Sequence, residues 1–281
     1  LCCLLSLLFF FSIQVIQVFC LFITTDFKPC IEFFYAKTIP QGISGDGYQA
    51  LCQYYESQYH FATLYDRNRR IPLFSAYILR PGEGSRHKKS VFVVIQLVSD
   101  KVNTGMKYQR DPDVNPDVKN SQAVNEDYRN SGYSRGHLAP SGHQQTEEDK
   151  KATFTLTNIV PQMEKFNNGP WKILEESMAK RLEVCTSKMY VITGVMPYVN
   201  DEPTINNRVT VPEYFWTAYC CPTFTAGLKD DIVKKNTEDG HDVMEMSLED
   251  LEKILQKRLK MPKMSLFKNE CKEEKSFFGF G

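Results

Sequence analysis

Short apolar runs separated by polar turns predict most strands of this chain. Residues 70–80 (RIPLFSAYILR) alternate apolar and polar side chains, and residues 90–98 (SVFVVIQLV) are rich in β-branched side chains. Both patterns are typical of strands. Three further runs are predicted as strands: residues 153–162, where Pro161 ends the strand, residues 188–197 and residues 209–221.

Apolar residues at helical spacing predict two longer helices. The first opens at Gly169-Pro170 and carries Trp171, Leu174, Met178 and Leu182 on one face. The second covers residues 247–259, with Ser247 three residues before Asp250 in a capping pattern and a stripe of Leu248, Leu251, Ile254 and Leu255. Residues 38–47 and 111–135 lack a period and are predicted as loops, with a basic hairpin connection over residues 80–89. We expect one α+β domain over residues 26–275, with a mixed central sheet and flanking helices.

The N-terminal segment breaks this pattern, because residues 1–25 carry no charged side chain. We expect a secretory signal peptide over residues 1–25 whose basic start is missing from this sequence. A transmembrane anchor is the alternative, since about 20 apolar residues can cross a bilayer. Gln14 and Gln17 weaken the anchor hypothesis, and the lack of a small-x-small cleavage site weakens the signal hypothesis. No second apolar run of this length follows, so a secreted protein without stable membrane insertion is expected after leader removal.

Cysteine use agrees with export. Six cysteines follow the leader, and none lies in a CxxC pair of the kind zinc sites use. Disulfides are therefore favoured over metal ligands, although six cysteines allow 15 pairings. Adjacent Cys220 and Cys221 lie in a predicted strand, so their side chains point to opposite faces and need different partners. Our hypothesis pairs Cys30 with Cys52, and Cys185 and Cys271 with the adjacent cysteines.

Net charge gives no sign of a polyanionic partner, because 34 basic residues balance 34 acidic ones. The balance hides an asymmetry, since residues 67–110 contain ten Lys or Arg and only two acids. A neutral protein can still present one positive face. Arg67, Arg69 and Arg70 are either a solvated charge run or nucleic-acid contacts.

Residues with the chemistry for phosphodiester cleavage gather between positions 133 and 175. His137 follows Arg135 in YSRGHLAP, Asn158 stands in TNIVPQ, and Asn167 and Glu175 flank the start of the first predicted helix. An imidazole can take a proton from water near neutral pH, a guanidinium can bind phosphate oxygens, and an amide oxygen can bind a hard divalent cation. Taken alone, each residue has an ordinary structural explanation. Trp171 is expected in the core, and no role is assigned to His143.

The ordered set RGHLAP, ATFTLTNIVPQ, FN…W…LE, YVITG and VPEYFW resembles the DNA/RNA non-specific endonucleases of the ββα-metal (His-Me finger) class. FFYAKTIPQG, FATLYDRNRRIPLFSAY and the cysteines are similar, more narrowly, to the vertebrate endonuclease domain-containing 1 protein group. The resemblance implies a ββα-metal motif that uses Mg²⁺ or Mn²⁺ to cleave DNA or RNA. It also implies that the protein contacts the phosphate backbone of the nucleic acid. It also implies His137 as general base, Arg135 on the phosphate, Asn158 as metal ligand, Glu175 orienting metal-bound water and Asn167 hydrogen-bonding within the site.

One position departs from this family. The motif usually reads Asp-Arg-Gly-His, and Ser134 replaces the Asp here. The substitution supports an alternative, a catalytically weak or inactive extracellular protein that binds nucleic acid or another polyanion. If the carboxylate is simply missing, Ser134→Asp is expected to raise the cleavage rate. A phosphodiesterase or phosphatase for small substrates is a third hypothesis, disfavoured by the broad basic stretch.

Overall fold

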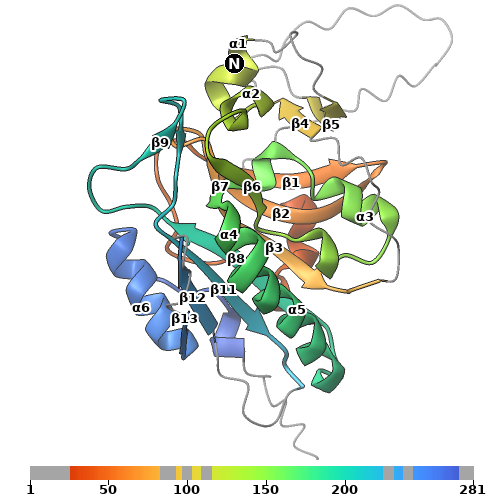
Figure 1. The fold of residues 1–281 in the computed structure, drawn as a ribbon. Helices are drawn as coiled ribbons and strands as arrows, with labels where there is room; N and C mark the ends of the chain where they lie inside the picture. The colour runs from red at the N-terminus through yellow and green to blue at the C-terminus, as the bar shows by residue number, and fades with distance from the viewer. Residues whose placement is uncertain are drawn as a thin grey trace, which may run out of the picture.

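A computed structural model of the protein describes residues 26–82, 93–96, 103–108, 116–223, 231–236 and 243–271 (Figure 1). The predicted signal peptide over residues 1–25 lies outside these residues, as do residues 83–89 of the predicted hairpin connection and residues 272–275 of the predicted domain.

The described residues form a nine-stranded main sheet in the order β13-β12-β11-β8-β3-β2-β1-β5-β4. Its neighbours pair antiparallel, except that β1 meets β5 in parallel. The strands are β1 (Tyr48–Tyr55), β2 (Gln58–Asp66), β3 (Ile71–Leu79), β4 (Val93–Gln96), β5 (Asn103–Tyr108), β8 (Met189–Met196), β11 (Tyr214–Cys220), β12 (Asp231–Lys235) and β13 (Val243–Met246). The mixed central sheet of the predicted α+β fold is thus confirmed.

Strands β3 and β8 lie at the centre, and every residue of β3 is buried. The alternation in 70–80 therefore does not separate a solvent-exposed face from a buried one. Its polar residue Ser75 is buried and bonds Thr63 of β2, with the two hydroxyl oxygens 2.9 Å apart. The sheet is covered on both faces, which is why its central strands tolerate so few charges.

The face turned toward the viewer in Figure 1 carries the helix that runs through α4 (Glu164–Phe166), η5 (Asn167–Trp171) and α5 (Lys172–Arg181). A separate two-stranded ribbon, β6 (Tyr133–His137) with β7 (Ile159–Met163), lies beside it. Trp171 and Met178 of the helix join Val191, Val195 and Phe215 of the sheet in one core. Trp171 is a core residue, as predicted.

The opposite face is covered by η1 (Lys28–Phe33) and α6 (Leu248–Arg258). Ser247 Oγ accepts from the Asp250 N–H, so the predicted N-cap is confirmed. Leu251 and Leu255 of the predicted stripe are buried against Trp216 of the sheet. Helix α6 therefore caps this second core as its amphipathic pattern indicates.

Short elements occupy the connections. They are η2 (Tyr35–Lys37), α1 (Pro116–Ser121), α2 (Asn125–Tyr128), η3 (Ser141–His143), α3 (Glu147–Ala152), η4 (Leu156–Asn158), η6 (Leu182–Val184), β9 (Thr204–Ile205), β10 (Val209–Thr210) and η7 (Lys268–Cys271). No helix within the described part of the chain is long and apolar enough to span a membrane.

Three predicted boundaries were wrong. Residues 116–121 and 125–128 of the predicted loop form α1 and α2, which are too short to be stable alone and depend on tertiary contacts. Strand β7 begins at Ile159, because residues 156–158 form a 3-10 turn, and it continues past Pro161. The predicted strand 209–221 is divided at Pro212, which ends the short pairing of β10 before β11 begins.

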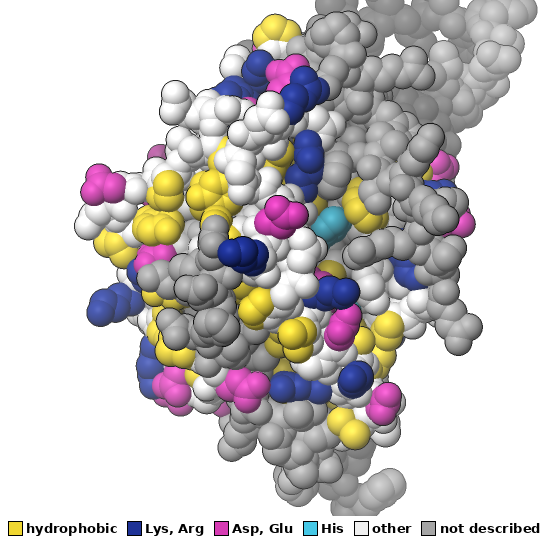
Figure 2. Space-filling view, viewed as in Figure 1, with side chains coloured by type: hydrophobic (Ala, Val, Ile, Leu, Met, Phe, Trp, Pro, Cys, Tyr) yellow, Lys and Arg dark blue, Asp and Glu magenta, His cyan; other side chains and the backbone are white. Residues whose placement is uncertain are grey.

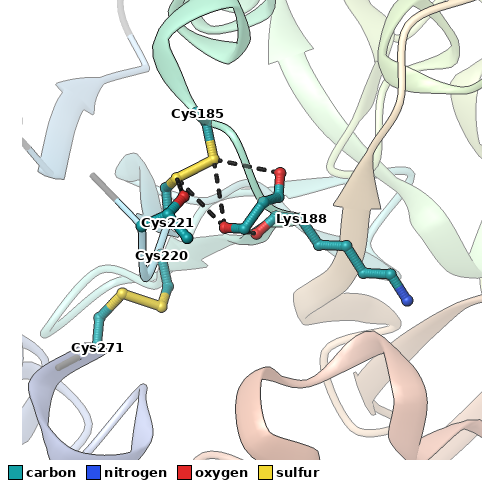
Figure 3. Close-up of a disulfide and its surroundings, with 7 residues drawn as sticks. Cys185, Lys188, Cys220, Cys221 and Cys271 are labelled. Atoms are coloured by element: carbon teal, nitrogen blue, oxygen red, sulfur yellow. Dashed lines mark hydrogen bonds between the residues drawn. A yellow bond between two sulfur atoms is a disulfide. The ribbon is translucent and has the colours of Figure 1, made fainter. Parts of the chain in front are cut away.

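Three disulfides join Cys30 to Cys52, Cys185 to Cys221 and Cys220 to Cys271. The adjacent cysteines belong to different cores, Cys220 to the α6 side and Cys221 to the α5 side. Figure 3 shows the two bonds leaving β11 in different directions. The expected separation of Cys220 and Cys221 is confirmed, together with the hypothetical pairing.

Candidate active site

The β6–β7 ribbon presents His137 at its end. His137 of β6 pairs with Ile159 of β7, and its half-buried ring packs edge-on against Phe154, with centroids 4.7 Å apart. Gly136 permits the close approach of the strands, because a Cβ there would lie 2.2 Å from Gln162 Oε1. Figure 2 shows a histidine side chain near the middle of this face, with Lys and Arg above and below it. The His137 ring is half-buried, its Nε2 atom is buried, and its orientation is held by packing against Phe154.

Asn158 lies fully buried beneath this ribbon. Its Oδ1 accepts from the Ala139 N–H and from Ser75 Oγ, both at 2.9 Å, and its Nδ2 donates to two backbone carbonyls, those of Ala139 and Thr153. An amide oxygen has two lone pairs, so both acceptor positions are used by the protein. This bonding favours a structural role for Asn158, which fixes the backbone just after His137, over its predicted role as metal ligand.

Asn167 has the opposite environment. It is half-buried, and its Nδ2 donates to Ser134 Oγ at 3.1 Å. The Ser134 hydroxyl in turn donates to the Gln162 carbonyl at 2.9 Å. The amide nitrogen is thereby anchored to β6, and the orientation of Oδ1 is fixed. Ser134 makes two hydrogen bonds, so it links the strand of His137 to the helix of Asn167.

A π-helical turn brings Asn167 to this position. The predicted helix start at Gly169-Pro170 lies inside the observed helix, which begins at Glu164 and widens over Asn167–Trp171. Pro170 has no N–H for an α-helical bond, and Gly169 has φ −114° and ψ −109°, outside the helical region. The sequence signal for a helix start was therefore a π-bulge, a feature that is frequent at functional sites.

Arg135 leaves the ribbon toward α2. Its guanidinium lies 5.3 Å from the centroid of the Tyr128 ring, and it donates to the Asn125 carbonyl at 3.1 Å. Packing over an aromatic ring holds a guanidinium in place without neutralising its charge. Of the other candidate phosphate contacts, Arg69 instead pairs with Asp66 and Glu202, and Arg70 donates to the Arg208 carbonyl.

Glu175 lies on α5, where its backbone carbonyl accepts from His143 Nε2 at 2.8 Å. Glu175 and His143 line a small internal cavity together with Tyr77 of β3. Burial lowers the pKa of His143 to about 4, against the opposing effect of its bond to Glu175. His143 is therefore neutral at physiological pH. Nothing local in the sequence marks His143, and the motif comparison marks Ser134 only as a departure, because the partners of both residues lie on distant elements.

The donors suit a hard, largely hydrated cation. Within the described ranges no three His, Cys, Asp or Glu side chains gather in a metal-binding cluster. The half-buried Asn167 Oδ1 is an oxygen donor of the kind Mg²⁺ takes when it keeps several waters. The structure thus brings Asn167, Ser134 and His137 together through β6, with Arg135 on the same strand, and places Asn158 beneath them.

The chain is similar to several known proteins. A family model described as DNA/RNA non-specific endonuclease matches residues 41–257. The human endonuclease domain-containing 1 protein is 32% identical over 254 residues, covering 88% of this chain and 48% of that protein. Human mitochondrial endonuclease G is 33% identical over 106 residues, 34% of this chain and 35% of that protein. A crystal structure of the EndoG/EndoGI complex, 23% identical with a TM-score of 0.54, covers 73% of this chain and 83% of that chain.

The chain spans about half the length of the endonuclease domain-containing 1 proteins it matches. The similarity to the EndoG chain concerns the fold, which agrees with the ββα arrangement of β6, β7 and α5. The family model covers most of the described domain, including the RGH strand and the helix of Asn167. The chain belongs to the DNA/RNA non-specific endonuclease family.

Proposed function

We propose that the protein is a secreted, metal-dependent endonuclease that hydrolyses phosphodiester bonds in DNA, RNA or both with little sequence specificity. Membership of a nuclease family supports the reaction class. The observation that carries the proposal is the Ser134–Asn167 hydrogen bond, which holds an amide oxygen beside the strand of the half-buried His137 imidazole. Three disulfides support secretion, since such bonds persist in oxidising compartments.

In this proposal His137 takes the proton of the attacking water. An unperturbed imidazole is largely neutral at pH 7 and can act as a base there. The edge contact with Phe154 holds the ring, so that its orientation is set before substrate binds. Arg135, fixed over Tyr128, stabilises the charge that grows on the phosphate oxygens.

We assign the cation to Asn167 and leave Asn158 as a structural residue. A bound Mg²⁺ or Mn²⁺ would supply neutralisation of charge at the phosphate and the leaving oxygen. Ser134 orients the Asn167 amide so that its oxygen faces away from the donor bond. Glu175 contributes a carboxylate from the next part of the same helix, α5.

Nicking of a supercoiled plasmid tests the proposal. Cleavage with Mg²⁺ and its loss in EDTA are expected, with a parallel RNA substrate to determine preference. Binding without cleavage would favour the alternative, an inactive nucleic-acid-binding protein. Since contacts to the backbone release counterions, binding is expected to weaken steeply with salt in either case.

The metal assignment has its own matched control in the chain, because Asn168 is an exposed amide next to Asn167. Asn167→Ala is expected to raise the Mg²⁺ concentration for half-maximal rate at least ~10-fold, about 1.4 kcal/mol. Asn168→Ala is expected to leave it unchanged. Asn158→Ala is expected to lower the melting temperature, because four hydrogen bonds of a buried amide are lost. An Asn167→Ala protein with the wild-type Mg²⁺ requirement contradicts the assignment.

A further inference from the structure

A chain of buried polar side chains crosses the interface between α5 and the main sheet. It consists of Tyr77 on β3, Thr193 on β8, Thr217 on β11, Met178 on α5 and His143 on η3, each at most 3% exposed. All five line the same small cavity. In a core that is otherwise apolar, such a polar chain specifies one arrangement of the elements that it joins.

The contacts of these buried polar side chains begin at Glu175 of α5 and end at Met178, three residues later on the same helix. His143 Nε2 lies 2.8 Å from the Glu175 carbonyl, and His143 Nδ1 lies 2.9 Å from Tyr77 Oη. Thr193 contacts Tyr77, and the Thr193 and Thr217 hydroxyls lie 3.1 Å apart. Thr217 Oγ1 donates to Met178 Sδ at 3.8 Å. Helix α5 is thus tied to three neighbouring strands through Glu175 and Met178.

The two partners of His143 fix its tautomer. A carbonyl only accepts, so Nε2 carries the hydrogen in the bond to Glu175. In a neutral ring Nδ1 is then an acceptor, and Tyr77 donates to it. The low pKa of His143 agrees with this neutral form. Neither ring nitrogen is left for proton exchange with a substrate, so His143 does not resemble a second general base.

The backbone of His143 is held as firmly as its ring. Its carbonyl accepts from the Arg80 N–H at 2.9 Å, next to the end of β3, and its N–H donates to the Pro140 carbonyl at 3.1 Å. It lies only six positions after His137 in the sequence. His143 therefore connects the segment that follows the candidate base to the helix that carries Glu175 and follows Asn167.

We propose that His143 is a positioning residue, which sets the distance between the His137 strand and the Asn167–Glu175 helix through its bonds to Tyr77 and Glu175. This inference rests on the proposed nuclease function. It adds the buried His143 imidazole to that function. This group contacts neither substrate nor cation and affects cleavage by holding α5 in position.

The test compares His143→Leu, which removes both hydrogen bonds, with His143→Gln. A Gln amide offers a donor and an acceptor at nearly the separation of the two imidazole nitrogens. Buried His60 is the matched control, because it is 3% exposed and bonds Asp149 and Tyr55 away from α5. Amide hydrogen exchange of α5, with α6 as internal reference, and the Mg²⁺ dependence of plasmid cleavage are measured for each variant.

His143→Leu is expected to accelerate exchange in α5 about 10-fold relative to α6 and to raise the half-maximal Mg²⁺ concentration about 10-fold, since small misplacements of a site are costly. His143→Gln is expected to restore both values, and His60→Leu to change neither. If His143→Leu does not fold, Tyr77→Phe removes the hydroxyl that bonds His143 and contacts Thr193 but keeps the ring, and it is expected to change both quantities in the same direction.

Wild-type values in His143→Leu, or a Gln variant as defective as the Leu variant, would overturn the proposal. Exchange in α5 needs no catalysis, so it separates the two ideas. An inert wild-type protein whose α5 loosens in His143→Leu contradicts the nuclease function and keeps the structural tie. An active protein with unchanged α5 exchange contradicts the positioning role alone.

Discussion

Ser134 and Asn167 show how a hydroxyl can replace a carboxylate at the residue scale. The serine accepts from the Asn167 amide and donates to the Gln162 carbonyl. An aspartate could accept from the amide, but it would bring its charge against the Gln162 carbonyl without a hydrogen to donate. These bonds favour a site built around serine over the faster Ser134→Asp variant that the motif comparison suggested.

Ser134→Ala is expected to lower cleavage about 5-fold at limiting Mg²⁺, because one hydrogen bond of about 1 kcal/mol no longer orients Asn167. Ser134→Thr, which keeps the hydroxyl, is expected to behave like the wild type. Ser134→Asp is expected to remain at or below the wild-type rate. Initial rates on plasmid DNA, with melting curves to confirm folding, measure all three. A faster Ser134→Asp variant contradicts this interpretation.

His137→Ala is expected to lower the cleavage rate about 10²–10⁴-fold, because it removes the proposed general base. The ring is half-buried against Phe154, so folding and DNA binding are expected to survive. Plasmid cleavage and filter binding measure the two effects separately. Equal cleavage by the variant would remove His137 from the mechanism.

His143 also makes a residue-scale prediction about acid. Its pKa is about 4 in the folded protein and about 6.5 in an unfolded chain, where burial no longer lowers it. Between these values the unfolded state binds a proton that the folded state does not, so acidification favours unfolding. This contribution leaves stability unaffected above about pH 6.5 and costs about 3 kcal/mol by pH 4.

Urea unfolding at pH 7.5 and pH 4.5 measures this loss. His143→Gln has no group to titrate at this position and is expected to lose correspondingly less stability over the same interval. An equal loss of unfolding free energy in the wild type and in His143→Gln would show that His143 does not have a lowered pKa in the folded protein.

At the scale of elements, the local sequence pattern predicted the strands and helices that are stabilised by interactions within their own segments. Strand β8 and helix α6 match their predicted ranges closely, because β8 is a mostly apolar, buried run and α6 has its own N-cap and amphipathic stripe. Helices α1 and α2 were missed because their partners are distant. Likewise, no local sequence signal shows which of Asn158 and Asn167 has a free amide oxygen for a cation. The Asn158 oxygen is occupied by Ser75, which lies 83 residues away in the sequence.

The β9–β10 hairpin supplies those distant partners of α2. Arg208 Nε donates to the buried Asp127 at 2.8 Å, and Asn206 donates to the Asp127 carbonyl at 2.9 Å. Asp127 also accepts from the Val124 N–H at the start of α2. Because α2 carries the Tyr128 ring beneath Arg135, the hairpin supports the candidate phosphate contact from a distance.

Arg208→Ala is expected to destabilise the protein by about 2–3 kcal/mol, because it leaves a buried carboxylate without its cation. Arg208→Lys keeps the charge and is expected to lose less. Thermal and urea unfolding measure both. Cleavage at temperatures well below the transition is expected to fall in Arg208→Ala through the loosened Tyr128–Arg135 contact. A stable Arg208→Ala protein contradicts the role of the hairpin.

At the scale of the whole molecule, two cores on opposite faces of one sheet are each crossed by disulfides. Their loops span 22, 36 and 51 positions, and each bond is expected to contribute about 2–4 kcal/mol. Reduction is therefore expected to lower the melting temperature markedly. Alkylation of the unreduced protein followed by mass spectrometry is expected to leave all six of these cysteines unlabelled. Labelling of four or more would contradict the three bonds.

The adjacent Cys220 and Cys221 have a consequence for oxidative folding. A strand that slips by one residue against its neighbour turns every side chain to the other face. If β11 slipped on β8, Cys221 would face Cys271 and Cys220 would face Cys185, so oxidation would lock in the inverted strand with its aromatic residues on the wrong sides. In the native register Trp216 shares a core with Cys220, and Phe215 shares the other core with Cys221. The disulfide pairs formed by Cys220 and Cys221 therefore depend on the register of the whole of β11. Under oxidising conditions, native and misregistered chains would differ in these pairs.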